Sequence, residues 1–379
     1  MAGNSSRSAW IDNLRTAMVF LVVNMHACVT YSHVGGWYIK DPPEPPLSVK
    51  IPFLYWQGHL QAFFMGLLFF LAGVFAHGAF LRKGVRGFVG ERLLRLGAPA
   101  ALYMLVIHPL TVYGLLWQAD WGPRSELAER YFTTGQVLSG SGPLWFAVAL
   151  LLFSLVFAAW RTIRPARVEP ELKPAPTLPA IATFGVLLVL ATFAVRLIQP
   201  LDTNILNMQL CFFSQYIGAF SVGILAGRHG WLDSLASSRM AARAGWTVLV
   251  LGPLALTAVI TLGGLGKTGE FQPFKGGWHL QALGLATWEQ LSGVALGLGA
   301  MALFHRRFNS DSPVGRWLAR HSFGVYVLHT PVLVGLAILM HPLPGGPFIK
   351  MLILTMAGLV LTHLVAAGAK RVPGLGQIL

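Results

Sequence analysis

Charged side chains are scarce in this 379-residue chain, at 11% of the residues, whereas soluble domains carry about 25%. Only 14 residues are Asp or Glu, and hydrophobic residues make up 55% of the chain. A water-soluble fold of this length could not hide that much apolar side chain in its core. The shortage of charge therefore excludes an ordinary soluble protein and predicts a chain surrounded by lipid.

Cysteine is also rare, and this excludes two further classes of protein. Cys28 and Cys211 are the only two, and both fall in apolar segments. They offer neither a disulfide scaffold nor the ligands of a zinc site, so we expect no metal. The formal net charge of +14 is not gathered in a solvated basic domain, and we therefore expect no nucleic-acid partner.

Apolar runs of about 20 residues, long enough to cross a bilayer as helices, recur along the whole chain. They predict an all-α, polytopic transmembrane bundle of about ten helices that forms a single domain over residues 1–379. A segment rich in Pro and charge at about 164–178 is expected to be a flexible linker. The expected spans are 13–33, 57–80, 94–117, 143–163, 179–199, 205–226, 245–265, 280–303, 322–341 and 348–369.

The basic residues predict the orientation of the bundle. Twenty of the 28 Lys and Arg fall at one side of the expected spans, together with both termini. Because cytoplasmic loops carry the excess of Lys and Arg, both termini are expected on the cytoplasmic side of the membrane, near anionic lipid. The eight toward the other side are Lys40, Lys50, Arg124, Arg130, Arg196, Lys267, Lys275 and Lys350.

The first span carries two ionisable residues that share one helix face. Arg15 and His26 are 11 residues apart, which is about 20° past three full turns and roughly 16 Å along the axis. Ionisable groups inside a membrane are costly and are candidates for function. The alternative is an arginine that reaches the interface and a histidine that is simply packed.

Two arginines enter the third expected span one helical turn apart. Arg92 and Arg95 would form a pair of guanidiniums suited to phosphate oxygens, at a cytoplasmic helix start whose dipole also favours an anion. The alternative is ordinary positive charge on the cytoplasmic side.

These patterns, in this order, resemble the membrane-bound acyltransferase 3 family, which includes inner-membrane O-acyltransferases. Asp12, Arg15 and His26 match its first helix, and Arg92 and Arg95 match its R-x-x-R motif. The Trp-Phe pair of GPLWF and the Tyr and His of SFGVYVLHTP complete the resemblance, at Trp145, Phe146, Tyr326 and His329. The segment FFLAG is closer to the glucan succinyltransferase branch, although Ala72 stands where many relatives have Ser.

The resemblance implies a multi-pass protein of a bacterial-type inner membrane. It also implies transfer of an acyl group, acetyl or succinyl, from cytoplasmic acyl-CoA to a hydroxyl of an exported or periplasmic carbohydrate. Arg15, Arg92 and Arg95 would hold the CoA phosphates. His26, deeper in the bundle, would be the base that takes the proton of the acceptor hydroxyl. A macrolide-like small molecule is the alternative acceptor, and a transporter or flippase with a buried proton path is the alternative function.

Two further residues are assigned near this site. Glu289 is the only acid well inside a span, at a depth compatible with His26, and is predicted to orient that imidazole. A structural ion pair with Arg196, or a neutral hydrogen-bonded Glu, is the alternative. His329 is expected nearer the inner side, where it would contact CoA or only pack.

The acceptor is expected to meet residues at the outer ends of the helices. His59 and Gln61 open the second span from outside, and Trp145 opens the fourth. External tryptophans would either stack on sugar rings or, as we prefer, form an interfacial belt. These are Trp37, Trp56, Trp117, Trp121 and Trp278.

Overall fold

The computed structural model describes residues 9–121, 128–164 and 172–379. Within these ranges all regular structure is helical, apart from one isolated bridge between Ile205 and Met208. The long helices are α1 (Ala9–Ser32), α2 (Leu47–Arg92), α5 (Trp145–Ile163), α6 (Leu178–Arg196), α7 (Phe213–His229), α9 (Arg239–Leu262), α12 (Leu280–Arg307), α13 (Pro313–Met340) and α14 (Pro347–Ala369). Shorter ones are η1 (Leu93–Gly97), α3 (Ala98–Leu102), η2 (Tyr103–Ile107), η3 (Leu110–Leu116), α4 (Ala128–Thr133), η5 (Gln136–Ser139), η6 (Gly142–Leu144), η7 (Leu210–Phe212), α8 (Trp231–Ser237), α10 (Leu265–Thr268), α11 (Gln272–Lys275) and α15 (Leu375–Ile378).

The predicted helical membrane bundle is confirmed. Eight helical stretches in the described part of the chain are long and apolar enough to span a bilayer. One of them, Leu47–Leu116, contains two of the expected spans and turns at Gly84, whose backbone leaves the helical region (φ 63°, ψ −179°). The expected span at 280–303 lies in α12, which is not among the eight. The count of ten and the position of the termini stay predictions.

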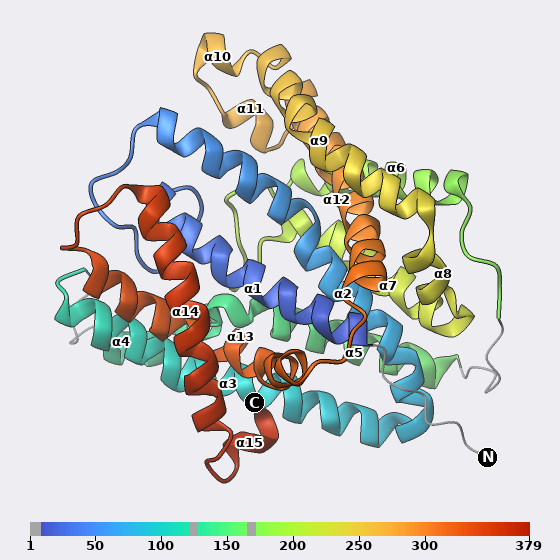
Figure 1. Ribbon diagram of the computed structural model, residues 1–379, viewed down its shortest axis with the longest axis horizontal. Helices are drawn as coiled ribbons and strands as arrows, with labels where there is room; N and C mark the ends of the chain where they lie inside the picture. Colours follow the sequence, from blue (N-terminus) through green and yellow to red (C-terminus); the bar gives the residue numbers. More distant parts are fainter. Residues whose placement is uncertain (1–8, 122–127, 165–171) are drawn as a thin grey trace.

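Helix α1 lies in the middle of the bundle and contacts α2, α12, α13 and α14. Figure 1 shows it crossing the molecule, with α13 and α14 to one side and α6, α9 and α12 to the other. Most of its side chains are buried, including Trp10, Leu14 and Val23. Helix α1 thus has both buried and partly exposed positions, and Asn13 makes exposed hydrogen bonds near its N-terminal end.

Helices α2 and α7 approach closely because glycines face each other across their contact. A Cβ atom on Gly73 would lie 2.2 Å from the Phe220 carbonyl oxygen, and one on Gly223 would lie 2.2 Å from that of Phe70. Small residues at such contacts let two backbones meet in a membrane, where lipid removes the hydrophobic force between helices. This packing holds α7 against the half of α2 that carries Gln57 and Gln61.

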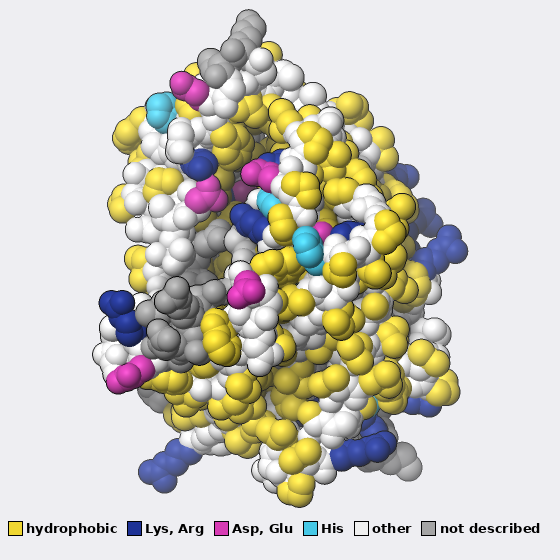
Figure 2. Space-filling view, turned by 90° about the vertical axis from the view of Figure 1, so that its left-hand side faces the viewer, with side chains coloured by type: hydrophobic (Ala, Val, Ile, Leu, Met, Phe, Trp, Pro, Cys, Tyr) yellow, Lys and Arg dark blue, Asp and Glu magenta, His cyan; other side chains and the backbone are white. Residues whose placement is uncertain are grey.

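The longer connections gather at one end of the bundle, which we call the long-loop end: residues 33–46, 117–121, 128–144, 197–212, 263–279 and 341–346. Asp41 from the first accepts hydrogen bonds from His341 (2.6 Å) and Lys350 (3.3 Å), and Leu201 N donates to Lys275 O (2.9 Å). Figure 2 shows this end hollowed, with charged and histidine side chains around the hollow. Residues 165–171 of the expected linker at 164–178 lie outside the described residues, and α6 begins at Leu178.

Candidate active site

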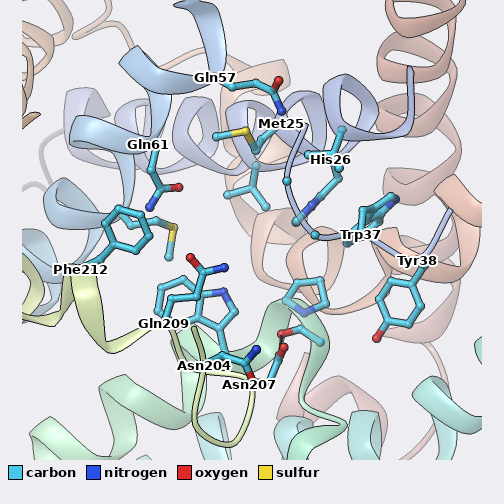
Figure 3. A pocket seen from close by; sticks show the side chains of 18 of the residues that line it. Met25, His26, Trp37, Tyr38, Gln57, Gln61, Asn204, Asn207, Gln209 and Phe212 are labelled. Carbon is cyan, nitrogen blue, oxygen red and sulfur yellow. Dashed lines mark hydrogen bonds between the residues drawn. The ribbon is translucent and has the colours of Figure 1, made fainter. Parts of the chain in front are cut away.

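A cavity of about 580 Å³ opens at the long-loop end, which is within the range of sites for small molecules. Helices α1, α2, α7 and α13 form its walls, and the connections at 33–38, 139–143 and 202–209 form its mouth. Figure 3 shows His26 reaching into it from α1, with Gln57 and Gln61 from α2. The cavity therefore joins the first helix to loops far along the chain.

His26 lies in a stack of three parallel rings, which we call the histidine stack. Its centroid is 3.7 Å from the ring of Trp37 and 5.3 Å from that of His329, with interplanar angles of 14° and 17°. Trp37 comes from the loop after α1, and His329 comes from α13. The stack fixes the plane of the His26 ring, and no carboxylate of the described residues touches it.

The nitrogens of the histidine stack have few partners. His329 Nδ1 lies 2.7 Å from the Tyr326 carbonyl oxygen; because a carbonyl only accepts, Nδ1 carries the proton and Nε2 holds the lone pair in the neutral ring. His329 Nε2 and His26 Nδ1 are buried without a hydrogen-bond partner among the described residues. Since Nδ1 is enclosed, the Nε2 edge of His26 is the one that meets the cavity. The structure thus places His329 beside His26, deeper than the expected position near the inner side.

Glu289 does not reach His26, which corrects the predicted triad. Both its oxygens accept hydrogen bonds from Arg196 Nη2, at 3.0 and 2.8 Å, and Gln290 Nε2 donates to Oε1 at 3.0 Å. Arg196 is fully buried on α6. The number of residues from the helix ends predicts that Glu289 lies at the same depth as His26, but it does not predict which side chain lies beside Glu289. Glu289 on α12 faces α6, not α1. The structural pair with Arg196, the alternative reading of the sequence, is the one formed.

The acceptor residues expected on α2 are split between two faces. Gln61 lines the cavity and donates from Nε2 to Tyr216 Oη at 3.2 Å. His59 lies outside the cavity: its Nδ1 bonds the Tyr55 carbonyl (2.7 Å), and its ring packs edge-on against Trp288 at 5.0 Å. Residues two apart on a helix are separated by about 200°, so Gln61 and His59 cannot face the same space.

Trp145, the other expected acceptor residue, does line the cavity. Its ring lies 5.6 Å from that of Tyr216, at an interplanar angle of 27°. The preceding Gly142, at φ 47°, leaves no room for a side chain against Tyr38 and Tyr103. Gly142–Leu144 thus turn the chain tightly beside the cavity, and α5 begins at Trp145.

The basic residues assigned to CoA lie toward the other end of the bundle. The Arg15 guanidinium sits over the ring of Phe75 at 4.7 Å, which ties α1 to α2. Arg92 sits over Phe88 at 5.0 Å and keeps its Nε buried without a partner among the described residues. Arg95 is largely exposed, with its Nε 3.5 Å from Glu91 Oε1.

The position of the arginine pair differs from the expected one. The helix resumes directly after Gly84, so Arg92 and Arg95 lie about two to three turns inside it instead of at its start. Arg95 lies in η1, a π-helical turn that widens the helix locally. The field of a helix N-terminus is therefore not available to them, because it fades within the first turn.

A family model described as an acyltransferase domain, that of the membrane acyltransferase 3 family, matches residues 8–368. The chain belongs to this family. The match spans α1 through nearly all of α14, so the cavity and the histidine stack lie wholly within it. No curated protein and no solved structure matches the chain. The protein is thus a multi-pass membrane acyltransferase.

Several residues of this acyltransferase cavity are not identified by sequence reasoning. Trp37, assigned to an interfacial belt, stacks on His26 instead. Tyr38 bonds Tyr103 (3.0 Å) and His108 Nδ1 (2.6 Å), and burial raises the pKa of its phenol, so the hydroxyl stays protonated. Asn204, Asn207 and Gln209 also line the cavity. They lie on irregular backbone, where no periodicity indicates which way a side chain points.

Proposed function

We propose that this acyltransferase moves an acetyl or succinyl group from acyl-CoA in the cytoplasm to a hydroxyl of an exported or periplasmic carbohydrate. The observation that carries the proposal is the position of His26, held by the histidine stack with its Nε2 edge at the cavity. A hydroxyl attacks a thioester only if its proton is removed, and a positioned neutral imidazole is suited to that task.

The acyl group moves directly from the thioester to the acceptor hydroxyl. The acceptor hydroxyl gives its proton to His26 Nε2 while its oxygen bonds to the thioester carbonyl carbon. The tetrahedral intermediate collapses with cleavage of the carbon–sulfur bond, and the leaving thiolate takes the proton back from the imidazolium. The products are an ester and CoA, and His26 returns to its neutral form. The reaction changes no oxidation state and needs neither a metal nor a redox partner.

The donor would enter from the end opposite the long loops. Arg15 and His26 lie on one helix, about 16 Å apart along its axis, so phosphates held near Arg15 place the acyl end of CoA toward His26. Arg92, whose buried Nε has no hydrogen-bond partner in the described part of the chain, is the stronger second phosphate ligand, and Arg95 shares its charge with Glu91. In this scheme His329 contacts the acyl end of the donor or the ring of His26, not the phosphates.

The acceptor would enter from the long-loop end; the excess of basic residues elsewhere supports the proposal that this end faces the outside of a bacterial inner membrane. Gln61 and Trp145 line this part of the cavity and offer a hydrogen-bonding amide and an aromatic face. We assign no acceptor contact to His59, because it lies on the other face of α2.

The direct test uses the purified protein in detergent with acetyl-CoA or succinyl-CoA and a panel of oligosaccharides. We expect release of free CoA thiol in step with appearance of an esterified sugar, followed by mass spectrometry. A transporter or flippase needs no thioester and would release none. Absence of both products with every donor would contradict the proposal.

A further inference from the structure

Five carboxamide side chains line the cavity, and we call them the amide collar: Gln57, Gln61, Asn204, Asn207 and Gln209. The two glutamines come from α2, and the other three come from the connection between α6 and α7. Figure 3 shows the two groups on opposite sides of the space, with His26 and Trp37 beside them. A molecule that reaches His26 from this end passes between them.

The loop side of the collar has a strained and specific backbone. Asp202, Leu206 and Asn207 all adopt positive φ (70°, 50° and 64°), a conformation that is costly for side chains other than Gly. Ile205 and Met208 exchange two main-chain hydrogen bonds of 2.9 Å, which closes the turn. Strain of this kind persists where surrounding contacts fix the loop and often marks a functional site.

One member of the collar anchors the loop, and two are left to meet a ligand. Asn207 Nδ2 donates to Ser141 Oγ (3.1 Å) and the Gly142 carbonyl (2.8 Å), which ties the loop to the turn before α5. Asn204 and Gln209 are exposed at the cavity and make no side-chain hydrogen bond to any described residue. Each offers two N–H donors and a carbonyl acceptor.

Formal charge is nearly absent from the lining. Among the described residues, Asp202 is the only one in the lining that has a carboxylate, and His26 and His108 are its histidines. Lys275 Nζ lies 2.7 Å from Asp202 Oδ2 and forms an ion pair with it. No Lys or Arg of the described part of the chain lines the cavity. A carboxylate or phosphate on the acceptor would thus lose water without gaining a countercharge, whereas hydroxyls find amides of matching chemistry.

We propose that the amide collar is the acceptor subsite and that it selects uncharged, polyhydroxylated acceptors over acidic ones. One neutral sugar unit would bind with hydroxyls on Asn204 and Gln209 and with its ring against Trp37 or Trp145, so that the next hydroxyl meets His26. This inference rests on the proposed function and adds the class of acceptor and the residues that choose it.

The experiment measures binding and turnover with two matched probes: a glucose trisaccharide, and the same trisaccharide ending in glucuronic acid. Calorimetry on the purified protein gives binding, and release of CoA from acetyl-CoA gives turnover. We expect the neutral probe to bind at least about tenfold more tightly than the acidic one. Asn204→Ala and Gln209→Ala should each raise the KM for the neutral probe about tenfold, with little change in kcat or in the KM for acetyl-CoA.

Two further variants sharpen the result. Gln209→Arg should admit the acidic probe, because it supplies the missing countercharge. Ile205→Ala changes an exposed side chain of the same loop that does not line the cavity and should leave both KM values as they were. Equal binding of the two probes, no binding of the neutral one, or unchanged KM in both alanine variants would overturn the inference. Selective binding of the neutral probe without CoA release would keep the subsite and refute the proposed function.

Discussion

His26 is the proposed general base, and its ring has an unusual support. A catalytic histidine is commonly oriented by a carboxylate, but here Trp37 and His329 hold the ring by parallel stacking. Stacking fixes the plane of the ring while leaving Nδ1 without a partner among the described residues. The imidazole is therefore positioned without a carboxylate from residues 9–121, 128–164 or 172–379 beside it.

His26→Gln should lower acyl transfer by about two to four orders of magnitude, which is the usual contribution of a positioned base. Acyl-CoA binding should survive, since the phosphates lie about 16 Å away along α1. Turnover and CoA affinity measured on the same preparation check both statements. His363→Gln, a histidine of α14 that does not line the cavity, is the control and should stay active. Near wild-type transfer by His26→Gln would refute the mechanism.

Glu289 is expected to act on stability and not on the chemistry. Glu289→Ala leaves Arg196 buried without its partner, and breaking a buried pair in this way costs about 3–5 kcal/mol. Thermal unfolding in detergent should show the loss, while the folded fraction keeps its activity per molecule. The double variant Arg196→Met, Glu289→Leu should recover part of the stability. Activity lost without a change in thermal stability would instead return Glu289 to the catalytic site.

Sequence reasoning found part of the site at this scale. His26, Gln61 and Trp145 could be predicted to meet because each belongs to a helix or a motif whose face or position is readable. The neighbour of Glu289 could not be read, since periodicity gives depth and face but not which helix packs there. Trp37 and the loop amides were out of reach because irregular backbone carries no period.

At the scale of the elements, the contact between α2 and α7 depends on three glycines that leave no room for side chains. A Cβ on Gly227 would lie 2.1 Å from the Val74 carbonyl oxygen, as close as those on Gly73 and Gly223 to their neighbours. The obstacle in each case is backbone, which cannot rotate away. The two helices must separate if any of these glycines is enlarged.

Gly223→Val should therefore destabilise the bundle by at least about 1–3 kcal/mol, the usual cost of overpacking. It should also impair transfer, because α2 and α7 both line the cavity. Gly335→Val on α13 is the matched control, since a Cβ there meets nothing within 4 Å. Unfolding temperatures of the two variants give the comparison. Equal stability of both would mean that the close approach of α2 and α7 is not required.

The part of the helical stretch Leu47–Leu116 that follows Gly84 carries the proposed phosphate ligands Arg92 and Arg95. Arg92→Ala should weaken acyl-CoA binding about tenfold or more, since a charge-assisted hydrogen bond contributes about 1.5–3 kcal/mol. Arg95→Ala should have a smaller effect, because Glu91 already shares its charge. Arg86→Ala removes an exposed charge from the same helix and serves as control. CoA affinity unchanged in the Arg92, Arg95 double variant would leave these arginines a role in topology only.

Helix type and approximate position could be predicted from apolar runs, but the helix ends could not. The second and third expected spans join into one stretch that bends at Gly84, because a single residue outside the helical region can turn the chain without a loop. Helix α12 could still be predicted from the length of its apolar run, at 280–303. Where two helices meet, glycine spacing indicates close packing but does not name the partner.

At the scale of the whole molecule, the two ends of the bundle differ in chemistry. The long-loop end holds a nearly uncharged, amide-lined cavity, and the other end holds Arg15, Arg92 and Arg95. A polyanionic donor and a neutral acceptor would therefore approach His26 from opposite sides of the membrane. Sequence charge alone predicts the basic residues at one end, whereas the cavity at the long-loop end required the fold.

The measurement that tests this account most directly uses proteoliposomes with acyl-CoA and acceptor on chosen sides. The donor carries a labelled acyl group, and a protease site at the C-terminus reports the orientation of each molecule. We predict labelled acceptor only when acyl-CoA is on the side of the C-terminus and the acceptor is on the side of the long loops. Transfer that needs both substrates on one side, or no labelled acceptor in any arrangement, would contradict the account.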